Sequence, residues 1–203
     1  VTTTNELIPS GETSSYRSNP LRLAEFTLSR RVPDYVPRAK KIAEEESKRR
    51  SGCASETLRA ALARFGDADT LLSVTQLGSC VFANKPGDGS AREQAASCQK
   101  VLGGLANICY EFATKRYRSN CINWGMLPFT LDADTPFDHQ PGDCVFVPDV
   151  RKLVGQGSED FPAMVLRADG SKTPLVLHVR GLTDDEREIL LDGCLMNYYA
   201  KRG

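Results

Sequence analysis

The stretch from Pro86 to Ala96, Pro-Gly-Asp-Gly-Ser-Ala-Arg-Glu-Gln-Ala-Ala, constrains the fold of this chain more than any other. A run with strand character, residues 78–83, precedes it. A helical pattern over residues 93–102 follows it and is closed by Gly103. Glycines in the connecting loop permit backbone angles that are closed to other residues. The order predicts a strand, a glycine loop and a helix in succession.

The start of that helix is where we expect an anion to bind. Ser90 is predicted to be the N-cap, with Glu93 three residues later completing a capping box. The free N–H groups and the positive dipole of a helix start favour negative charge, and Arg92 is placed to meet it together with Ser90. The loop is neither a phosphate-binding Walker loop nor a dinucleotide fingerprint, because the required lysine and third glycine are missing. Taken alone, such a loop is more often a plain turn with a helix cap.

The overall composition is that of an ordinary soluble globular protein. The chain has 203 residues, of which 40% are hydrophobic and 26% charged, and its formal net charge is zero. This balance argues against a general nucleic-acid or membrane-surface role. No apolar run approaches the roughly 18 residues of a membrane span, and no signal peptide is visible. We expect a cytoplasmic protein, or one of the mitochondrial matrix if the source is eukaryotic.

Cysteine and histidine usage gives no sign of a metal site or a disulfide framework. The chain has seven cysteines and no Cys-x-x-Cys pair, and several cysteines lie inside apolar runs. We interpret them as reduced core thiols. The two histidines, His139 and His178, are isolated from each other, and His178 lies in an alternating strand-like run, which favours a structural role.

The rest of the chain predicts a mixed α/β domain. Helical patterns cover residues 20–28, 36–50 and 55–65, and a second buried strand over 105–110 is expected to lie parallel to the first. Residues 112–129 are expected to be mostly irregular or briefly helical. Strands are predicted at 143–147, 163–167 and 174–179, the last two as a hairpin around Asp169-Gly170. Thr183 and Glu186 form a capping box for a final helix that runs to about Tyr199.

Three blocks resemble the swivel domain of the aconitase superfamily. Residues 87–96 are similar to its motif Gly-x-Gly-Ser-Ser-Arg-Glu-His-Ala-Ala. Residues 4–19 look like its Thr-Thr-Asp start with the arginine that follows, and residues 112–129 like its segment ending in Gly-Leu-Leu-Pro. The blocks occur in the family's order and cover most of the chain. The resemblance implies a β/β/α swivel-type domain over residues 1–203, with a mixed sheet, a C-terminal helix and a helical insertion at about 20–66.

The resemblance also implies a chemistry. Members of the superfamily are hydro-lyases that dehydrate and rehydrate hydroxy polycarboxylic acids, such as the tricarboxylic acids citrate and isocitrate. A large partner domain or subunit holds a [4Fe-4S] cluster, for which this chain carries no ligands. Ser90 aligns with the family's catalytic serine base. Arg92 and Arg17 align with arginines that bind substrate carboxylates. Because the chain starts with Val1 rather than Met, we expect a fragment or a processed subunit. We expect it to be inactive alone, because it carries no cluster ligands.

Two substrate-contacting positions depart from the family pattern. Asn5 stands where an active-site aspartate is expected, and Ala91 replaces the second serine of the motif. Gln94 replaces the common histidine. These changes make citrate itself a doubtful substrate. Two alternatives remain open: the small subunit of an isopropylmalate-type isomerase, which the helical insertion disfavours, and a non-catalytic carboxylate-binding module, which Asn5 and Ala91 support.

Overall fold

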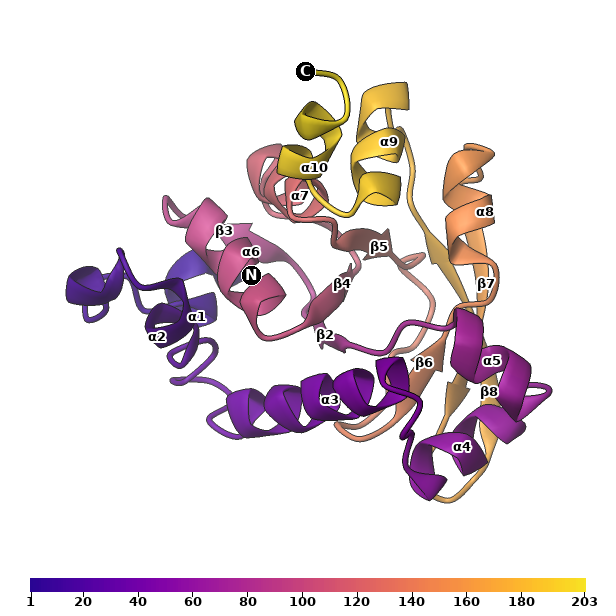
Figure 1. Ribbon diagram of the computed structural model, residues 1–203. Helices are drawn as coiled ribbons and strands as arrows, with labels where there is room; N and C mark the ends of the chain where they lie inside the picture. Colours follow the sequence, from indigo (N-terminus) through magenta and orange to yellow (C-terminus); the bar gives the residue numbers. More distant parts are fainter.

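A curled six-stranded sheet forms the centre of the computed structural model, which describes all 203 residues (Figure 1). The strand order is β2-β4-β5-β8-β7-β6, and a short two-stranded sheet pairs β1 with β3. The strands are β1 Thr2–Thr3, β2 Ser79–Phe82, β3 Pro86–Asp88, β4 Gly104–Cys109, β5 Leu127–Thr130, β6 Cys144–Phe146, β7 Asp160–Leu166 and β8 Lys172–His178. In the six-stranded sheet, β2, β4 and β5 are parallel and the remaining neighbours are antiparallel. The mixed α/β class and the parallel pairing of the first two predicted strands are thereby confirmed.

Ten helices surround the sheet. They are α1 Thr4–Leu7, α2 Pro20–Ala24, α3 Tyr35–Arg50, α4 Glu56–Ala63, α5 Ala68–Val74, α6 Arg92–Val101, α7 Lys115–Asn123, α8 Val150–Gly155, α9 Asp184–Asp192 and α10 Leu195–Ala200. No helix is both long and apolar enough to cross a membrane. The predicted helices at 36–50, 55–65 and 93–102 are confirmed as α3, α4 and α6.

Two apolar clusters lie on either side of the parallel strands. The first joins the N-terminal helices to α6 and α7, with Leu7, Ala95 and Tyr117 among its buried members. The second joins β5, β7 and β8 to α8 and α9, with Phe129 and Phe161 at its centre. Helix α7 contributes to both, so it connects the glycine-loop side of the molecule to the hairpin side.

Helices α3 to α5 link the two edge strands of the sheet. Near the end of α3, the carboxylate of Glu46 accepts a hydrogen bond of 3.0 Å from the backbone N–H of Leu77, just before β2. After α4, Phe65 stacks on Phe146 of β6 with ring centroids 4.4 Å apart. Figure 1 shows these helices running along one side of the molecule from α2 toward β6.

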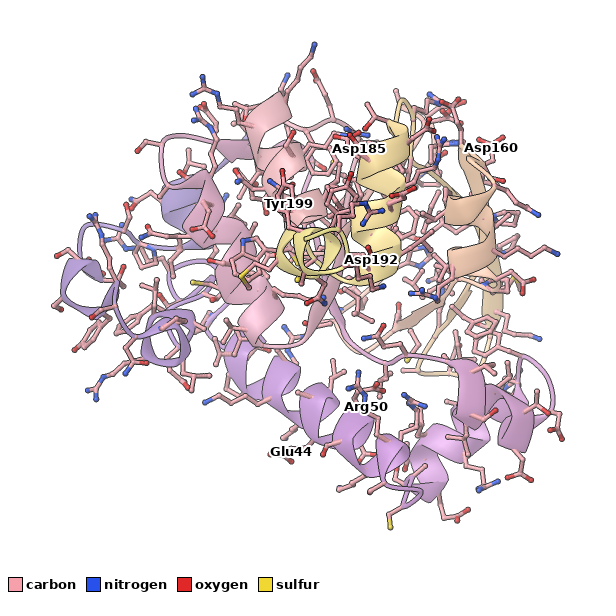
Figure 2. The ribbon with its side chains drawn as sticks, turned by 45° about the horizontal axis from the view of Figure 1, so that its top comes forward. Glu44, Arg50, Asp160, Asp185, Asp192 and Tyr199 are labelled. Carbon is pink, nitrogen blue, oxygen red and sulfur yellow. The ribbon has the colours of Figure 1, made fainter.

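The C-terminal region confirms the predicted hairpin and helix cap but corrects the length of the last helix. Strands β7 and β8 pair antiparallel, and Thr183 and Glu186 form the expected capping box. The helix then ends at Gly193, whose φ of +94° is left-handed, and α10 begins after it. Glycine at this position is a common helix stop. Figure 2 shows Asp185 and Asp192 on α9 and Tyr199 on the neighbouring α10.

Three other local predictions need correction. Residues 115–123 form a regular helix, α7, because the side chain of Thr114 caps its start. Helix α5 was not predicted, although Asp67 caps it in the same manner. The helix opened by Pro20 ends early, and Leu28 adopts a left-handed φ of +56°.

All seven cysteines are free thiols, and three of them lie in the core. Cys98, Cys109 and Cys121 are buried, and burial raises the pKa of each thiol to about 12. Cys53 and Cys144 are exposed. The interpretation as reduced core thiols therefore holds for part of the set.

Candidate active site

The glycine loop lies beside the N-terminal segment, although more than eighty residues of chain separate them. Strand β1 pairs parallel with β3, with Thr3 opposite Asp88. The backbone N–H of Thr2 also donates to the carbonyl of Lys85 at 2.8 Å. The first and second family-like blocks are thus held together by backbone hydrogen bonds.

Two glycines of the loop allow this close approach. Gly89 has φ +129°, and a Cβ added to it would lie 2.2 Å from Oγ1 of Thr4. Gly87 has φ +99°, and its Cβ would lie 2.4 Å from ring atoms of Tyr117. Neither site has room for a larger residue, and both backbone conformations favour glycine. The N-terminal segment and α7 therefore contact the loop directly.

Ser90 is not the N-cap of α6, so the capping-box prediction is wrong. The cap residue is Ala91, which offers no side-chain hydrogen bond to the helix. Glu93 instead accepts a hydrogen bond of 2.9 Å from Nε1 of Trp124, which ties the end of α7 to the start of α6. Ser90 itself is exposed. Because no side chain caps α6, its first N–H groups stay open to an anion.

Arg92, the first residue of α6, is the cation at this helix start. Its side chain is partly buried, and its Nε is buried without a hydrogen-bond partner. Burying an N–H without an acceptor costs free energy of folding, so a ligand that accepts this hydrogen bond would stabilise the group. The planar guanidinium can bind a carboxylate through two parallel hydrogen bonds.

The other three expected site residues lie in the N-terminal segment and in the glycine loop, and they differ in exposure. Asn5 is exposed in α1, next to Thr4, which contacts Gly89. Ala91 directly follows Ser90. Arg17 is exposed at the end of a short 3-10 helix, Ser14–Tyr16. The segment after Arg17 becomes α2, which packs on α6. A hollow of about 520 Å³ lies on α2.

Sequence reasoning missed the contribution of α7. The hydroxyl of Thr114 donates to the carbonyl of Gly87 at 3.0 Å and also caps α7. Lys115 and Arg116, both exposed, follow in the first turn and add positive charge beside the loop. The signal for this was Thr114 three residues before Tyr117 in a helical pattern, inside a block that we expected to be mostly irregular or briefly helical.

No three His, Cys, Asp or Glu side chains gather into a group that could hold a metal ion. His178 is buried between two carboxylates in the sheet, with Nδ1 2.7 Å from Asp160 and Nε2 3.1 Å from Asp132. His178 thus has a place in the packing of the sheet, in agreement with the structural role expected for it.

Comparison with known proteins agrees with this geometry. Residues 46–134 match the family model of the aconitase C-terminal domain, a range that includes Ser90, Ala91 and Arg92. The chain is 30% identical over 141 residues, 67% of its length, to aconitate hydratase A of Bradyrhizobium diazoefficiens. This chain belongs to the aconitase family. It is also 33% identical over 119 residues, 57% of its length, to the mitochondrial aconitate hydratase of Emericella nidulans.

The fold of the aconitase swivel domain is shared over nearly the whole chain. The structure resembles the crystal structure of 3-isopropylmalate dehydratase from Methanocaldococcus jannaschii with a TM-score of 0.52. The match covers 98% of this chain and 87% of that one, at 21% sequence identity. The chain spans only 15% and 14% of the length of the two aconitate hydratases.

Proposed function

We propose that this chain is the swivel domain of an aconitase-like hydro-lyase, which dehydrates and rehydrates a hydroxy polycarboxylic acid. The observation that carries the proposal is that two segments distant in sequence contact the loop that leads into α6. Thr4 contacts Gly89, Tyr117 contacts Gly87, and Ser90 and Arg92 lie at the uncapped start of α6. A turn with an ordinary helix cap would need none of these contacts.

In this proposal, Ser90 removes the proton next to a substrate carboxylate. A serine hydroxyl is a poor base unless its oxyanion is stabilised by nearby N–H groups and cations. The open N–H groups of α6 and the guanidinium of Arg92 supply that stabilisation, because a helix start favours negative charge. Arg92 and Arg17 bind substrate carboxylates, while Asn5 and Ala91 contact the substrate without adding charge.

The remaining chemistry belongs to a partner. A [4Fe-4S] cluster in a large cluster-binding domain or subunit would polarise the substrate hydroxyl when bound, and no residue of this chain would hold it. The site residues here line an open surface, which suits a site completed by a second domain. We accordingly assign no turnover to residues 1–203 alone, and we treat them as one domain with a helical insertion.

The first experiment replaces Ser90 in the complete enzyme. Loss of a positioned general base typically costs about 10²- to 10⁴-fold in rate, so Ser90→Ala should reduce kcat by that amount while the iron content stays unchanged. Ser97→Ala is the matched control, because Ser97 lies on the same helix and its hydroxyl donates to the carbonyl of Gln94, within that helix. Turnover of Ser90→Ala equal to that of the control would reject Ser90 as the base.

A second candidate function is that of an isopropylmalate isomerase-type small subunit. It is favoured by the coverage of the fold match, 98% of this chain. Turnover of isopropylmalate but not of citrate or isocitrate would support it.

If tricarboxylates bind in calorimetry, lose affinity in Arg92→Ala and are never turned over, a non-catalytic carboxylate-binding module is the better description.

A further inference from the structure

Three buried polar side chains form a closed hydrogen-bonded ring beneath the glycine loop. Asn107 Nδ2 donates to Gln99 Oε1 at 2.9 Å, and Gln99 Nε2 donates to the hydroxyl of Tyr117 at 2.9 Å. The Tyr117 hydroxyl then donates to Asn107 Oδ1 at 2.9 Å, which completes the ring. The three residues come from α6, β4 and α7 and are at most 1% exposed.

The ring fixes the orientation of Tyr117. Each member gives and receives one hydrogen bond within the ring, and a break anywhere would leave a buried polar group unsatisfied. Gln99 Nε2 makes a second bond to the carbonyl of Ala95 at 2.8 Å, which holds the ring to the middle of α6. Tyr117 therefore has one energetically favoured hydroxyl position relative to both helices.

Tyr117 in turn supports the loop that carries Ser90. Its ring occupies the space where a Cβ of Gly87 would lie. Its backbone N–H donates to Thr114 Oγ1 at 3.2 Å, and that hydroxyl donates to the carbonyl of Gly87. The N–H of Ala113 bonds the carbonyl of Pro86 at 2.9 Å. The strand side of the loop is thus held by α7, and the ring connects α7 to the helix on the other side of the loop.

We infer that Tyr117 is a positioning residue that sets the place of Ser90 through Gly87, with Gln99 and Asn107 locking Tyr117. The inference rests on the proposed function of Ser90. The exposed Ser90 receives no side-chain cap interaction at α6, so its position follows from the backbone on either side. The ring joins those two sides through buried side chains. Misplacement of a reacting group by about 1 Å can cost on the order of a hundredfold in rate.

The test separates loop order from activity. In the 203-residue chain, ¹⁵N relaxation of Tyr117→Phe should show lower order parameters at the amides of Gly87, Gly89 and Ala91. Tyr110→Phe is the matched control: its hydroxyl bonds the carbonyl of Thr135 at 2.7 Å, away from the loop, and its loss should leave those amides unchanged. Gln99→Met, which removes a ring member that does not contact Gly87, should reproduce the effect of Tyr117→Phe.

In the complete enzyme, Tyr117→Phe should reduce kcat roughly ten- to a hundredfold and change KM by less than about twofold, since binding groups remain in place. If the loop amides of Tyr117→Phe and Gln99→Met are as ordered as those of the control variant, the inference is overturned. If the loop amides become disordered while kcat stays unchanged, Tyr117 does support the loop. Ser90 is then not the base, and Tyr117 has no positioning role in catalysis.

Discussion

Glu46 is a buried carboxylate held by four hydrogen bonds at the end of α3. Arg49 donates two of them, Arg50 one, and the backbone N–H of Leu77 the fourth. Burial by itself would raise the pKa of Glu46, but these donors outweigh it and lower the pKa to about 2. Figure 2 shows Glu44 and Arg50 at different places on α3. The charge of Glu46 therefore stabilises the link between α3 and β2.

Replacing this charge should destabilise the chain in a pH-dependent way. Hydrogen bonds to a charged group contribute about 1.5–3 kcal/mol, so Glu46→Gln should lower the free energy of unfolding by about that much at pH 7. Because the folded pKa is depressed, this contribution is complete above pH 4.5, the ordinary value, and is lost as pH falls toward about 2. Urea unfolding at several pH values measures it.

Glu44→Gln is the control for this prediction, since Glu44 is exposed on the same helix. Exposed substitutions usually change stability by less than about 0.5 kcal/mol. A difference between wild type and Glu46→Gln that stays constant down to pH 2 would contradict the role of the charge.

Among the elements, α7 and α9 end against each other at two glycines. Gly125 follows α7 with φ +70°, and a Cβ on it would lie 1.9 Å from the carbonyl oxygen of Gly193, which ends α9. The obstacle is backbone, which cannot rotate away as a side chain can. The two helix ends therefore approach more closely than any side chain allows, and this junction positions the helix that supports the glycine loop.

Gly125→Ala should consequently be much more harmful than an alanine at a comparable open glycine. Gly142 has φ +106° and no atom within 4 Å of an added Cβ, so Gly142→Ala tests the backbone strain alone. Strain at a left-handed residue costs about 1–3 kcal/mol, and overpacking adds about as much again. Thermal unfolding of both variants measures the difference, and equal destabilisation would mean that the Gly125–Gly193 contact is not tight.

At the scale of the whole molecule, the sheet consists of a parallel half and an antiparallel half with a narrow junction. Strands β5 and β8 share one residue pair, Thr130 with His178. The side chain of His178 strengthens this junction, because it bridges Asp132 after β5 and Asp160 at the start of β7. Figure 2 shows Asp160, the first residue of β7, near the edge of the view beside α8. The imidazole is thus a hydrogen-bonded link between the two halves.

Removing that link should loosen the junction locally. His178→Ala should lower the free energy of unfolding by about 2–3 kcal/mol, through lost hydrogen bonds and lost packing. Hydrogen exchange should accelerate in β5 and β8 while β2 and β4 remain protected. Lys172→Ala, at the opposite end of β8, should leave the β5 amides unchanged. Equal acceleration in all six strands would show that His178 stabilises the fold globally and does not link its halves.

The amino-acid sequence by itself determined the local elements whose signals lie within a few residues. The strand, loop and helix around Ser90 could be predicted, as could the hairpin at Asp169-Gly170 and the capping box of Thr183. Glycine, proline and capping side chains act on backbone angles and on the nearest N–H groups, so their effect is visible in the sequence. The family motifs likewise identified Ser90, Arg92, Asn5, Ala91 and Arg17 as candidates, and their roles stay predictions.

Only the tertiary structure decided what surrounds those residues. The sequence predicted a cap at Ser90, but the cap residue is Ala91, in a loop that Thr4 and Tyr117 contact. The side chain of Glu93 accepts a hydrogen bond from Trp124 and does not complete a capping box. The ring beneath the loop and the Gly125–Gly193 contact likewise could not be predicted from the sequence. Each depends on residues distant in sequence that pack at a fixed separation, and that separation is set by the cores on both sides of the sheet.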